Sequence, residues 1–476
     1  MWKATKYTEL FKTLSDRKMK NKNLYINRRE FLKVTGVAAA TTTAALHGCS
    51  SGKESSDSLG AVPTDKMTYR NYPSLGDTVS LLGYGCMRWP TIPNPEGRGE
   101  IIDQEAVNGL VDYAIEHGVN YFDTAPTYVQ GRSEEATGIA LKRHPRDKFF
   151  IATKMSNPSN PDFDASVAMY KNSFEQLQVD YIDYYLLHNI GTVGARGFDF
   201  RFIENGLLDF LLKEREAGRI RHLGWSFHGI VEQFDYILSY HEKVHWDFVQ
   251  IQMNYTDWKN ATEGRNVNAA YLYEELWKRN IPSVVMEPLL GGRLSNLPTH
   301  IVSRLKEQNP DGSAASWAFR YAGTPEGVLT VLSGMTYMEH LQDNIRTYSP
   351  LVSLTEEQNE FLYETAELML QYPTIPCNAC DYCMPCPYGI DIPGLLVHYN
   401  KCVNDGIVPK TAADADYRKN RRAFLVSFDR NVEKIRQADH CIGCKHCNED
   451  CPQSIDIPAE LHKLDAFIEQ LKQETL

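Results

Sequence analysis

The sequence lacks the features that mark nucleic-acid-binding or membrane-spanning proteins. Its 476 residues carry a net charge of −11, so no basic field is available to attract phosphate groups. The apolar run at residues 34–46 is too short to cross a bilayer comfortably. Cysteine is scarce except near the C-terminus, where eight of the eleven cysteines form two tight clusters. We therefore expect no nucleic-acid partner, and the cysteine distribution favours metal binding over disulfides.

The first fifty residues contain a basic motif followed by this apolar run. Residues 27–33 read Asn-Arg-Arg-Glu-Phe-Leu-Lys. Basic residues ahead of a short apolar stretch are typical of a signal segment. The segment resembles a twin-arginine export signal, and the Leu-His-Gly-Cys that ends at Cys49 resembles a lipoprotein cleavage box. The resemblance implies an exported protein, periplasmic or anchored to the membrane by a lipid on Cys49. A cytoplasmic protein with a chance Arg28-Arg29 pair is the alternative.

Between residues 80 and 349, short β-branched or aromatic runs alternate with amphipathic helical stretches such as residues 104–117 and 205–217. This alternation is typical of parallel strands joined by crossover helices. The eight candidate strands are residues 81–86, 121–124, 149–153, 182–187, 222–226, 248–252, 283–286 and 328–332. Eight strands in roughly 270 residues predict an α/β fold of the (β/α)8 TIM-barrel type, with its chemistry at the C-terminal strand ends. An open doubly wound sheet is the alternative, but no G-x-G-x-x-G follows a first strand.

Polar residues stand at the ends of three successive candidate strands. Asp123 and Tyr128 lie in Asn-Tyr-Phe-Asp-Thr-Ala-Pro-Thr-Tyr, Lys154 ends Ile-Ala-Thr-Lys, and His188 ends Tyr-Tyr-Leu-Leu-His. Together these segments resemble the catalytic tetrad of the aldo/keto reductases. The resemblance implies that Tyr128 protonates a carbonyl oxygen while a nicotinamide hydride attacks the carbonyl carbon. Lys154 is then expected to lower the pKa of Tyr128, with Asp123 holding Lys154 and His188 orienting the carbonyl.

The same resemblance implies contacts to NAD(P)H at later strand ends. The candidates are Ser226, Gln252, Asn254, Leu289, Gly291, Ser333, Gly334 and Asn344. Many members of the family bind the 2′-phosphate of NADP with basic residues, which Gly334 and His340 replace here. The choice between NAD and NADP therefore stays open.

Two four-cysteine runs give the strongest signal in the sequence. The first is Cys377, Cys380, Cys383 and Cys386, and the second is Cys441, Cys444, Cys447 and Cys451. A proline follows each run. Zinc is the alternative metal, but neither run contains a paired histidine. The runs resemble dicluster ferredoxin motifs, which implies two [4Fe-4S] clusters.

In such ferredoxins the fourth cysteine of each run binds the other cluster. The resemblance thus implies one cluster on Cys377, Cys380, Cys383 and Cys451, and the other on Cys441, Cys444, Cys447 and Cys386. Residues 386–393 mirror residues 451–458, and each copy ends in Ile-Asp-Ile-Pro before a helical pattern. With helix-like residues 395–404 and 423–438, this predicts a mainly helical module. Cys86 and Cys402 lie outside both runs and are expected to be packing residues.

These features divide the chain into five predicted segments. They are a signal at 1–48, a tether at 49–66, a barrel at 67–350, a connecting helix at 351–376 and an iron-sulfur module at 377–476. The leading hypothesis is an oxidoreductase that reduces a small carbonyl compound with NAD(P)H and exchanges electrons with a partner protein through the clusters. Two alternatives remain: a carbonyl reductase whose clusters are structural, and an electron carrier whose barrel is not catalytic.

Overall fold

The computed structural model describes residues 61–97, 99–157, 161–191, 195–261, 266–370, 374–411 and 413–474. The predicted signal, Cys49 and most of the predicted tether lie outside the described residues. None of the helices in these ranges is long and apolar enough to cross a membrane.

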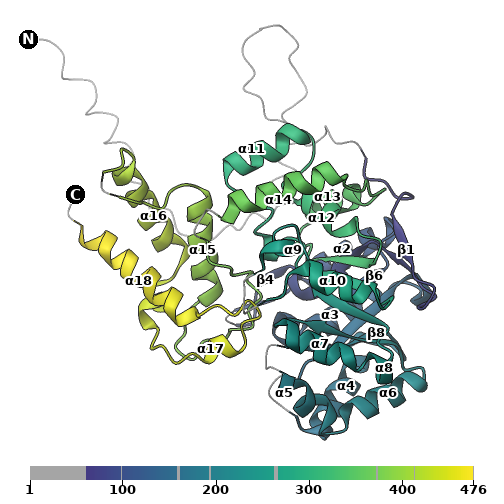
Figure 1. The fold of residues 1–476 in the computed structure, drawn as a ribbon. Helices are drawn as coiled ribbons and strands as arrows, with labels where there is room; N and C mark the ends of the chain where they lie inside the picture. Colours follow the sequence, from purple (N-terminus) through teal and green to yellow (C-terminus); the bar gives the residue numbers. More distant parts are fainter. Residues whose placement is uncertain are drawn as a thin grey trace, which may run out of the picture. The chain divides into compact units, whose positions relative to one another are not determined.

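Eight parallel strands close into a barrel (Figure 1). They are β3 (Leu82–Gly85), β6 (Tyr121–Asp123), β7 (Phe150–Met155), β8 (Ile182–Ile190), β9 (Ile220–Phe227), β10 (Phe248–Gln252), β11 (Ser283–Met286) and β12 (Val328–Ser333). Each corresponds to one of the eight predicted strands, and the strand order around the barrel is β10-β11-β12-β3-β6-β7-β8-β9. The predicted (β/α)8 barrel is therefore confirmed, and the doubly wound sheet is wrong.

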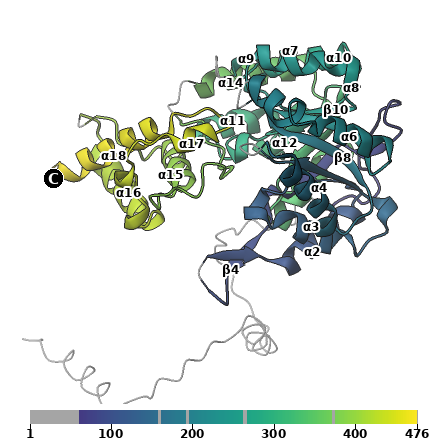
Figure 2. The same ribbon diagram turned by 90° about the horizontal axis from the view of Figure 1, so that it is seen from below.

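One helix follows each strand of the barrel and covers its outer face (Figure 2). These helices are α2 (Gln104–Glu116), α3 (Ser133–Leu141), α4 (Phe163–Leu177), α6 (Leu207–Glu216), α7 (Val231–Ser239), α10 (Ala269–Trp277), α12 (Ala314–Gly323) and α13 (Met338–Thr347). Further helices lie in the connections: α5 (Ala195–Phe198), α8 (His241–Val244), α9 (Asp257–Asn260) and α11 (Thr299–Gln308). The barrel strands are buried on both faces, which explains why they read as almost continuous apolar runs.

Two hairpins precede the first crossover helix. The strands β1 (Tyr69–Asn71) and β2 (Thr78–Ser80) pair antiparallel ahead of β3, and β4 (Thr91–Pro93) pairs with β5 (Glu100–Ile102) after it. Leu75 and Val79 of the first hairpin pack with Tyr121 and Tyr184 from the barrel interior. The first hairpin thus closes the N-terminal end of the barrel and leaves the C-terminal end for a site.

After the barrel, the chain is helical. Helix α14 (Glu356–Leu370) occupies the predicted connecting segment, and α15 (Ile392–Asn404), α16 (Tyr417–Asn431), α17 (His446–Glu449) and α18 (Ile457–Gln473) follow. Helices α15, α16 and α18 contact one another around a core of their own, as Figures 1 and 2 show.

The predicted repeat organises this helical part. Helices α15 and α18 each begin in one copy, with Asp391 and Asp456 as N-caps that accept backbone hydrogen bonds from Gly394 and Ala459. Helix α16 differs from its predicted span of 423–438. It begins earlier, and it ends at Asn431 because Val432 adopts an extended backbone and is buried.

Candidate active site

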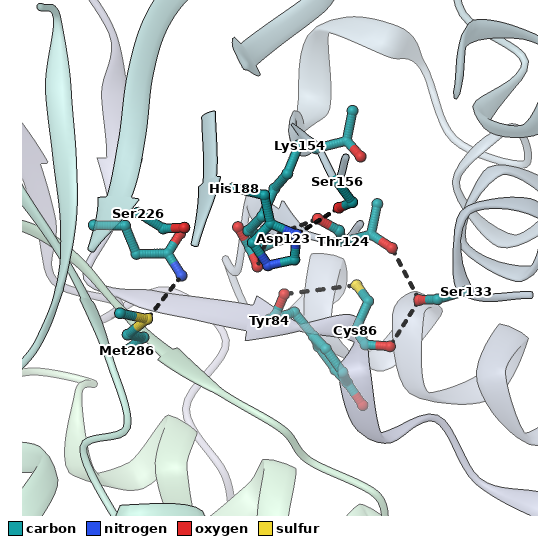
Figure 3. Close-up of polar contacts among 12 residues, drawn as sticks. Tyr84, Cys86, Asp123, Thr124, Ser133, Lys154, Ser156, His188, Ser226 and Met286 are labelled. Carbon is teal, nitrogen blue, oxygen red and sulfur yellow. Dashed lines mark hydrogen bonds and ion pairs between the residues drawn. The ribbon is translucent and has the colours of Figure 1, made fainter. Parts of the chain in front are cut away.

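The alternation of side chains along the barrel strands brings the predicted catalytic residues together. Tyr121, Ala152 and Tyr184 belong to the same interior cluster on β6, β7 and β8. Because strand side chains alternate between faces, the residues two or four positions later also point inward. Those residues are Asp123, Lys154 and His188, at the C-terminal ends of their strands. Figure 3 shows these three side chains close together.

Asp123 and Lys154 form a buried ion pair. The Lys154 ammonium lies 2.6 Å from Asp123 Oδ1 and also donates to the Thr124 carbonyl at 2.7 Å. The side chains of Lys154 and Asp123 are 0% and 3% exposed. Burial raises the pKa of Asp123 and lowers that of Lys154, while each charge opposes the shift of the other. Breaking such a pair leaves one charge without compensation in a dry environment.

Tyr128 lies just beyond β6, with its ring against Lys154. The Lys154 Nζ is 4.7 Å from the centre of the Tyr128 ring, so the ammonium meets the face of the ring. Burial raises the pKa of Tyr128 well above 10, and neighbouring Tyr382 and Asp123 raise it further. The net shift is thus upward because burial dominates it, whereas the resemblance led us to expect a lowering by Lys154. Tyr128 keeps its proton and is available as a donor.

His188 is held between two hydroxyl groups. Its Nδ1 contacts Ser156 Oγ, and its Nε2 lies 3.1 Å from the Tyr382 hydroxyl. Burial lowers the pKa of His188 well below 6.5, and the positive charges of Lys154 and Arg201 lower it further. His188 is thus neutral and can donate from only one ring nitrogen. A neutral imidazole suits a role in orienting a carbonyl oxygen.

A cavity of about 420 Å³ begins at the catalytic residues and continues past the later strand ends. Asp123, Tyr128 and His188 line one part of it. Six of the predicted nucleotide contacts also line it: Ser226, Leu289, Gly291, Ser333, Gly334 and Asn344. The Asn344 amide donates to Ser333 Oγ at 3.0 Å, which fixes both groups at the far part of the cavity. The site predicted from three strand ends is thus continuous with a groove from the others.

Gln252 and Asn254 do not line this cavity, whereas Gln250 and Asn189 do. The residues of β10 that point into the barrel are Phe248, Gln250 and Gln252. Of these, Gln250 lies at the level of the cavity along the barrel axis. Gln252 lies one layer higher, where it accepts a hydrogen bond from Gln453 of the C-terminal part at 3.2 Å. The Asn254 amide donates to Asp257 at 2.8 Å. Gln250 was not among the predicted contacts, although its inward position follows from the alternation along β10.

The loop of the first cysteine run lies against the cavity. Cys380, Tyr382 and Asn378 line it together with the barrel residues. The Arg88 guanidinium donates to the carbonyls of Asn378 and Ala379 at 2.7 and 3.2 Å. A Cβ on Gly291 would come within 2.2 Å of the Asn378 carbonyl oxygen, so only glycine permits this approach. The C-terminal part therefore completes the wall of the site, which no pattern in the sequence indicated.

The cysteines of the two runs gather in two mixed groups. Burial raises the pKa of the Cys383 thiol, and Cys380, Cys377, Cys451 and Cys447 raise it further. In the same way, burial raises the pKa of Cys447 to about 11, with further contributions from Cys444, Cys441 and Cys386. Cys451 thus lies near cysteines of the first run and Cys386 near those of the second, while Cys447 is close enough to both sets to act on Cys383. Within the described ranges, no three His, Cys, Asp or Glu side chains are placed to hold a single metal ion.

Cys86 and Cys402 are 0% and 1% exposed and pack in the barrel core and the C-terminal core, as predicted.

Comparison with known proteins identifies the barrel. The aldo/keto reductase family model matches residues 81–366, more than half of the chain. The Bacillus subtilis protein YqkF, described as an uncharacterized oxidoreductase, is 27% identical over 313 residues, which cover 59% of this chain and 90% of that protein. An aldo-keto reductase of Mycolicibacterium smegmatis is 31% identical over 206 residues, covering 42% of this chain and 64% of the relative.

Among solved structures, the holo form of an aldo-keto reductase from Bacillus halodurans has the same fold. It aligns with a TM-score of 0.50 and 23% identity, and the alignment covers 63% of this chain and 96% of that structure. The family match ends at residue 366, before the first cysteine run. The chain therefore belongs to the aldo/keto reductase family and is an oxidoreductase with a helical C-terminal extension beyond its barrel.

Proposed function

We propose that the protein reduces a small carbonyl compound with NAD(P)H at the site formed by Asp123, Tyr128, Lys154 and His188. The observation that carries this proposal is the single cavity, in which a protonated phenol and a neutral imidazole face the same space. His188 would orient the carbonyl oxygen, and Tyr128 would give it a proton as negative charge develops there. Lys154 and Asp123 would hold Tyr128 in place through the ring contact and the ion pair.

The cavity fits a nicotinamide nucleotide. From the catalytic residues it passes Ser226 and Gln250, then Leu289 and Gly291. It ends at Ser333, Gly334 and Asn344. An elongated ligand with a reactive ring and a distant adenosine needs such a continuous path. When bound, the nucleotide supplies the hydride. The side chains of Ser226, Gln250 and Asn344 would hold it by hydrogen bonds.

The two cysteine groups fit two [4Fe-4S] clusters. A cubane is bound by four thiolates at four different irons, so its cysteines need not converge on one point as those of a mononuclear site do. Buried thiols that raise one another's pKa are costly to ionise without a cation, and bound iron would remove this cost. When bound, the clusters supply one-electron transfer. We propose that the ligand sets are crossed, as the grouping of Cys451 with the first run suggests.

The position of the first group favours coupling between clusters and barrel. Cys380 lines the same cavity as Tyr128 and His188, while Cys444 of the second group is exposed. Such an order places one cysteine group beside the nucleotide path and the other at the surface, where a partner protein would exchange electrons with it. The alternative of structural clusters has support in the packing of the first loop on Arg88 and Gly291. A non-catalytic barrel would not require Asp123, Tyr128 and His188 around one cavity with Lys154 paired behind them.

The test is anaerobic purification of the native protein, followed by its absorption spectrum, its iron content and assays with NADH and NADPH. Tyr128→Phe removes the proposed proton donor and should abolish reduction of aldehyde probes while nucleotide affinity stays within about twofold, because the phenol acts in the chemical step. Tyr388→Phe is the matched control, since Tyr388 is 46% exposed and does not line the cavity. An unchanged rate in Tyr128→Phe contradicts the mechanism.

For localisation, we propose export by the twin-arginine route on the sequence motif at residues 27–33. Replacing Arg28 and Arg29 by Lys should retain the protein in the cytoplasm. Cell fractionation measures this, and continued appearance of the double variant outside the cytoplasm contradicts export by this route.

A further inference from the structure

The hydroxyl of Tyr382 occupies the space between the two groups that would bind a carbonyl oxygen. It lies 3.1 Å from His188 Nε2, and the Tyr128 hydroxyl is a further polar neighbour, whose pKa Tyr382 raises. The rings of Tyr382 and His188 meet edge to face, with their centres 6.1 Å apart. Tyr382 comes from the loop between Cys380 and Cys383, 194 residues away from His188 in the chain. The contact therefore exists only because the C-terminal part covers the barrel.

These two partners are the same ones that the proposed reaction assigns to substrate. If the Ser156 hydroxyl donates to Nδ1, the proton of the neutral His188 is on Nε2 and points at the Tyr382 oxygen. The Tyr128 hydroxyl is the other donor to this point. The Tyr382 oxygen, which faces both donors, therefore takes the position that the proposed reaction assigns to the carbonyl oxygen of the substrate.

We propose that Tyr382 is a specificity-determining residue that holds the carbonyl-oxygen position in the substrate-free enzyme, so that each substrate must displace its hydroxyl. The inference rests on the proposed function for the identity of the substrate as a carbonyl compound. It adds a criterion for substrate binding. A carbonyl compound binds well only when its other contacts in the cavity offset the hydrogen bond that Tyr382 loses. Small aldehydes with few other contacts are poor substrates.

The moving part is the side chain of Tyr382 and not its loop. Arg88 holds the loop at the carbonyls of Asn378 and Ala379, and Gly291 packs directly on Asn378. Since Cys380 and Cys383 flank Tyr382, a cluster bound to both would hold the backbone on each side of it. A rotation of the ring into the remaining cavity leaves these contacts intact.

The experiment compares Tyr382→Phe and Tyr382→Ala with the wild type and with Tyr388→Phe, all as full-length protein purified anaerobically. Benzamide is the binding probe, because it offers a carbonyl oxygen that is not reduced, and isothermal titration calorimetry measures its affinity. Removing the hydroxyl should tighten benzamide binding by about two- to tenfold, the range that one neutral hydrogen bond spans. Tyr382→Ala should show at least the same gain, and Tyr388→Phe should show none.

Kinetics with 4-nitrobenzaldehyde provide the second measurement. Tyr382→Phe should lower KM by a similar factor with kcat nearly unchanged, because the hydroxyl competes with binding and takes no part in the chemical step. Benzamide affinity that is unchanged or weaker in both Tyr382 variants overturns the inference, and so does a fall in kcat at constant KM. If benzamide binds more tightly but no variant reduces an aldehyde, the proposed function fails and the occupancy of the site by Tyr382 stands. If the wild type reduces aldehydes but benzamide affinity does not change, the inference alone fails.

Discussion

Removing the charge of Asp123 tests how far the buried ion pair serves stability and how far it serves catalysis. In Asp123→Asn the Lys154 ammonium, with 0% exposure, keeps the Thr124 carbonyl and gains an uncharged amide oxygen as acceptors, but it loses its countercharge. Breaking a buried pair by changing one member costs about 3 to 5 kcal/mol. Burial already lowers the pKa of Lys154, so the lysine can lose its proton in the variant, which places the expected loss near the lower end, at about 3 kcal/mol. That loss changes the folded-to-unfolded ratio more than a hundredfold.

A double variant separates the two roles. Asp123→Leu with Lys154→Met replaces the pair by apolar groups of similar size, and such replacements are often neutral or stabilising. We expect its stability to lie within about 1 kcal/mol of the wild type, while carbonyl reduction stays lost because the ring contact of Lys154 with Tyr128 is gone. Asp405→Asn is the control: the Lys401–Asp405 pair has the same 2.6 Å distance but is 57% and 43% exposed, so its loss should cost under about 1 kcal/mol.

The assay is urea unfolding followed by tryptophan fluorescence. All tryptophans after residue 2 lie between Trp89 and Trp317, so the signal reports on the barrel and not on the cysteine-rich part. The midpoint should fall in Asp123→Asn and recover in the double variant at an unchanged slope. Equal stability of Asp123→Asn and wild type, or a double variant less stable than Asp123→Asn, would refute the reasoning.

The remaining predictions concern pH, nucleotide choice and cluster ligands. Burial keeps the pKa of His188 low and that of Tyr128 high, so His188 stays neutral as pH falls and Tyr128 stays protonated as pH rises. Neither residue should therefore produce an inflection in the pH–rate profile between about pH 6 and pH 9. An inflection at about pH 6.5 that disappears in His188→Gln contradicts this prediction. NADP(H) should bind at most a few times more tightly than NAD(H) in fluorescence titrations. Among the described residues that line the cavity, Arg88 is the one arginine or lysine, and carbonyl oxygens engage it; a hundredfold NADP preference counts against this prediction. Iron analysis should give about eight irons per chain, and Cys451→Ala should perturb the EPR signal of the cluster on the first run, whereas a change confined to the second run would show local ligation.

The strand pattern made the barrel predictable. Parallel strands inside a barrel are buried on both faces, so each of the eight reads as an apolar run without reference to its neighbours. Asp123, Lys154 and His188 could be chosen because each ends such a run, and the alternation of strand side chains turns all three inward. The capped starts of α15 and α18 were equally local, since Asp and Pro act within one turn of the helix.

Other properties depend on distances between segments far apart in the chain, and only the tertiary structure decided them. Burial, Tyr382 and Asp123 raise the pKa of Tyr128. The sequence shows only that Lys154 is near, so the direction of this shift could not be predicted from it. Gln250 faces the cavity in place of Gln252 because the C-terminal part covers the next layer of the barrel through Gln453. The contact of Tyr382 with His188 joins residues 194 positions apart. Spacing along a strand or helix is a local property that the sequence determines, whereas the packing of the cysteine-rich loop on the barrel mouth depends on the shape of both surfaces.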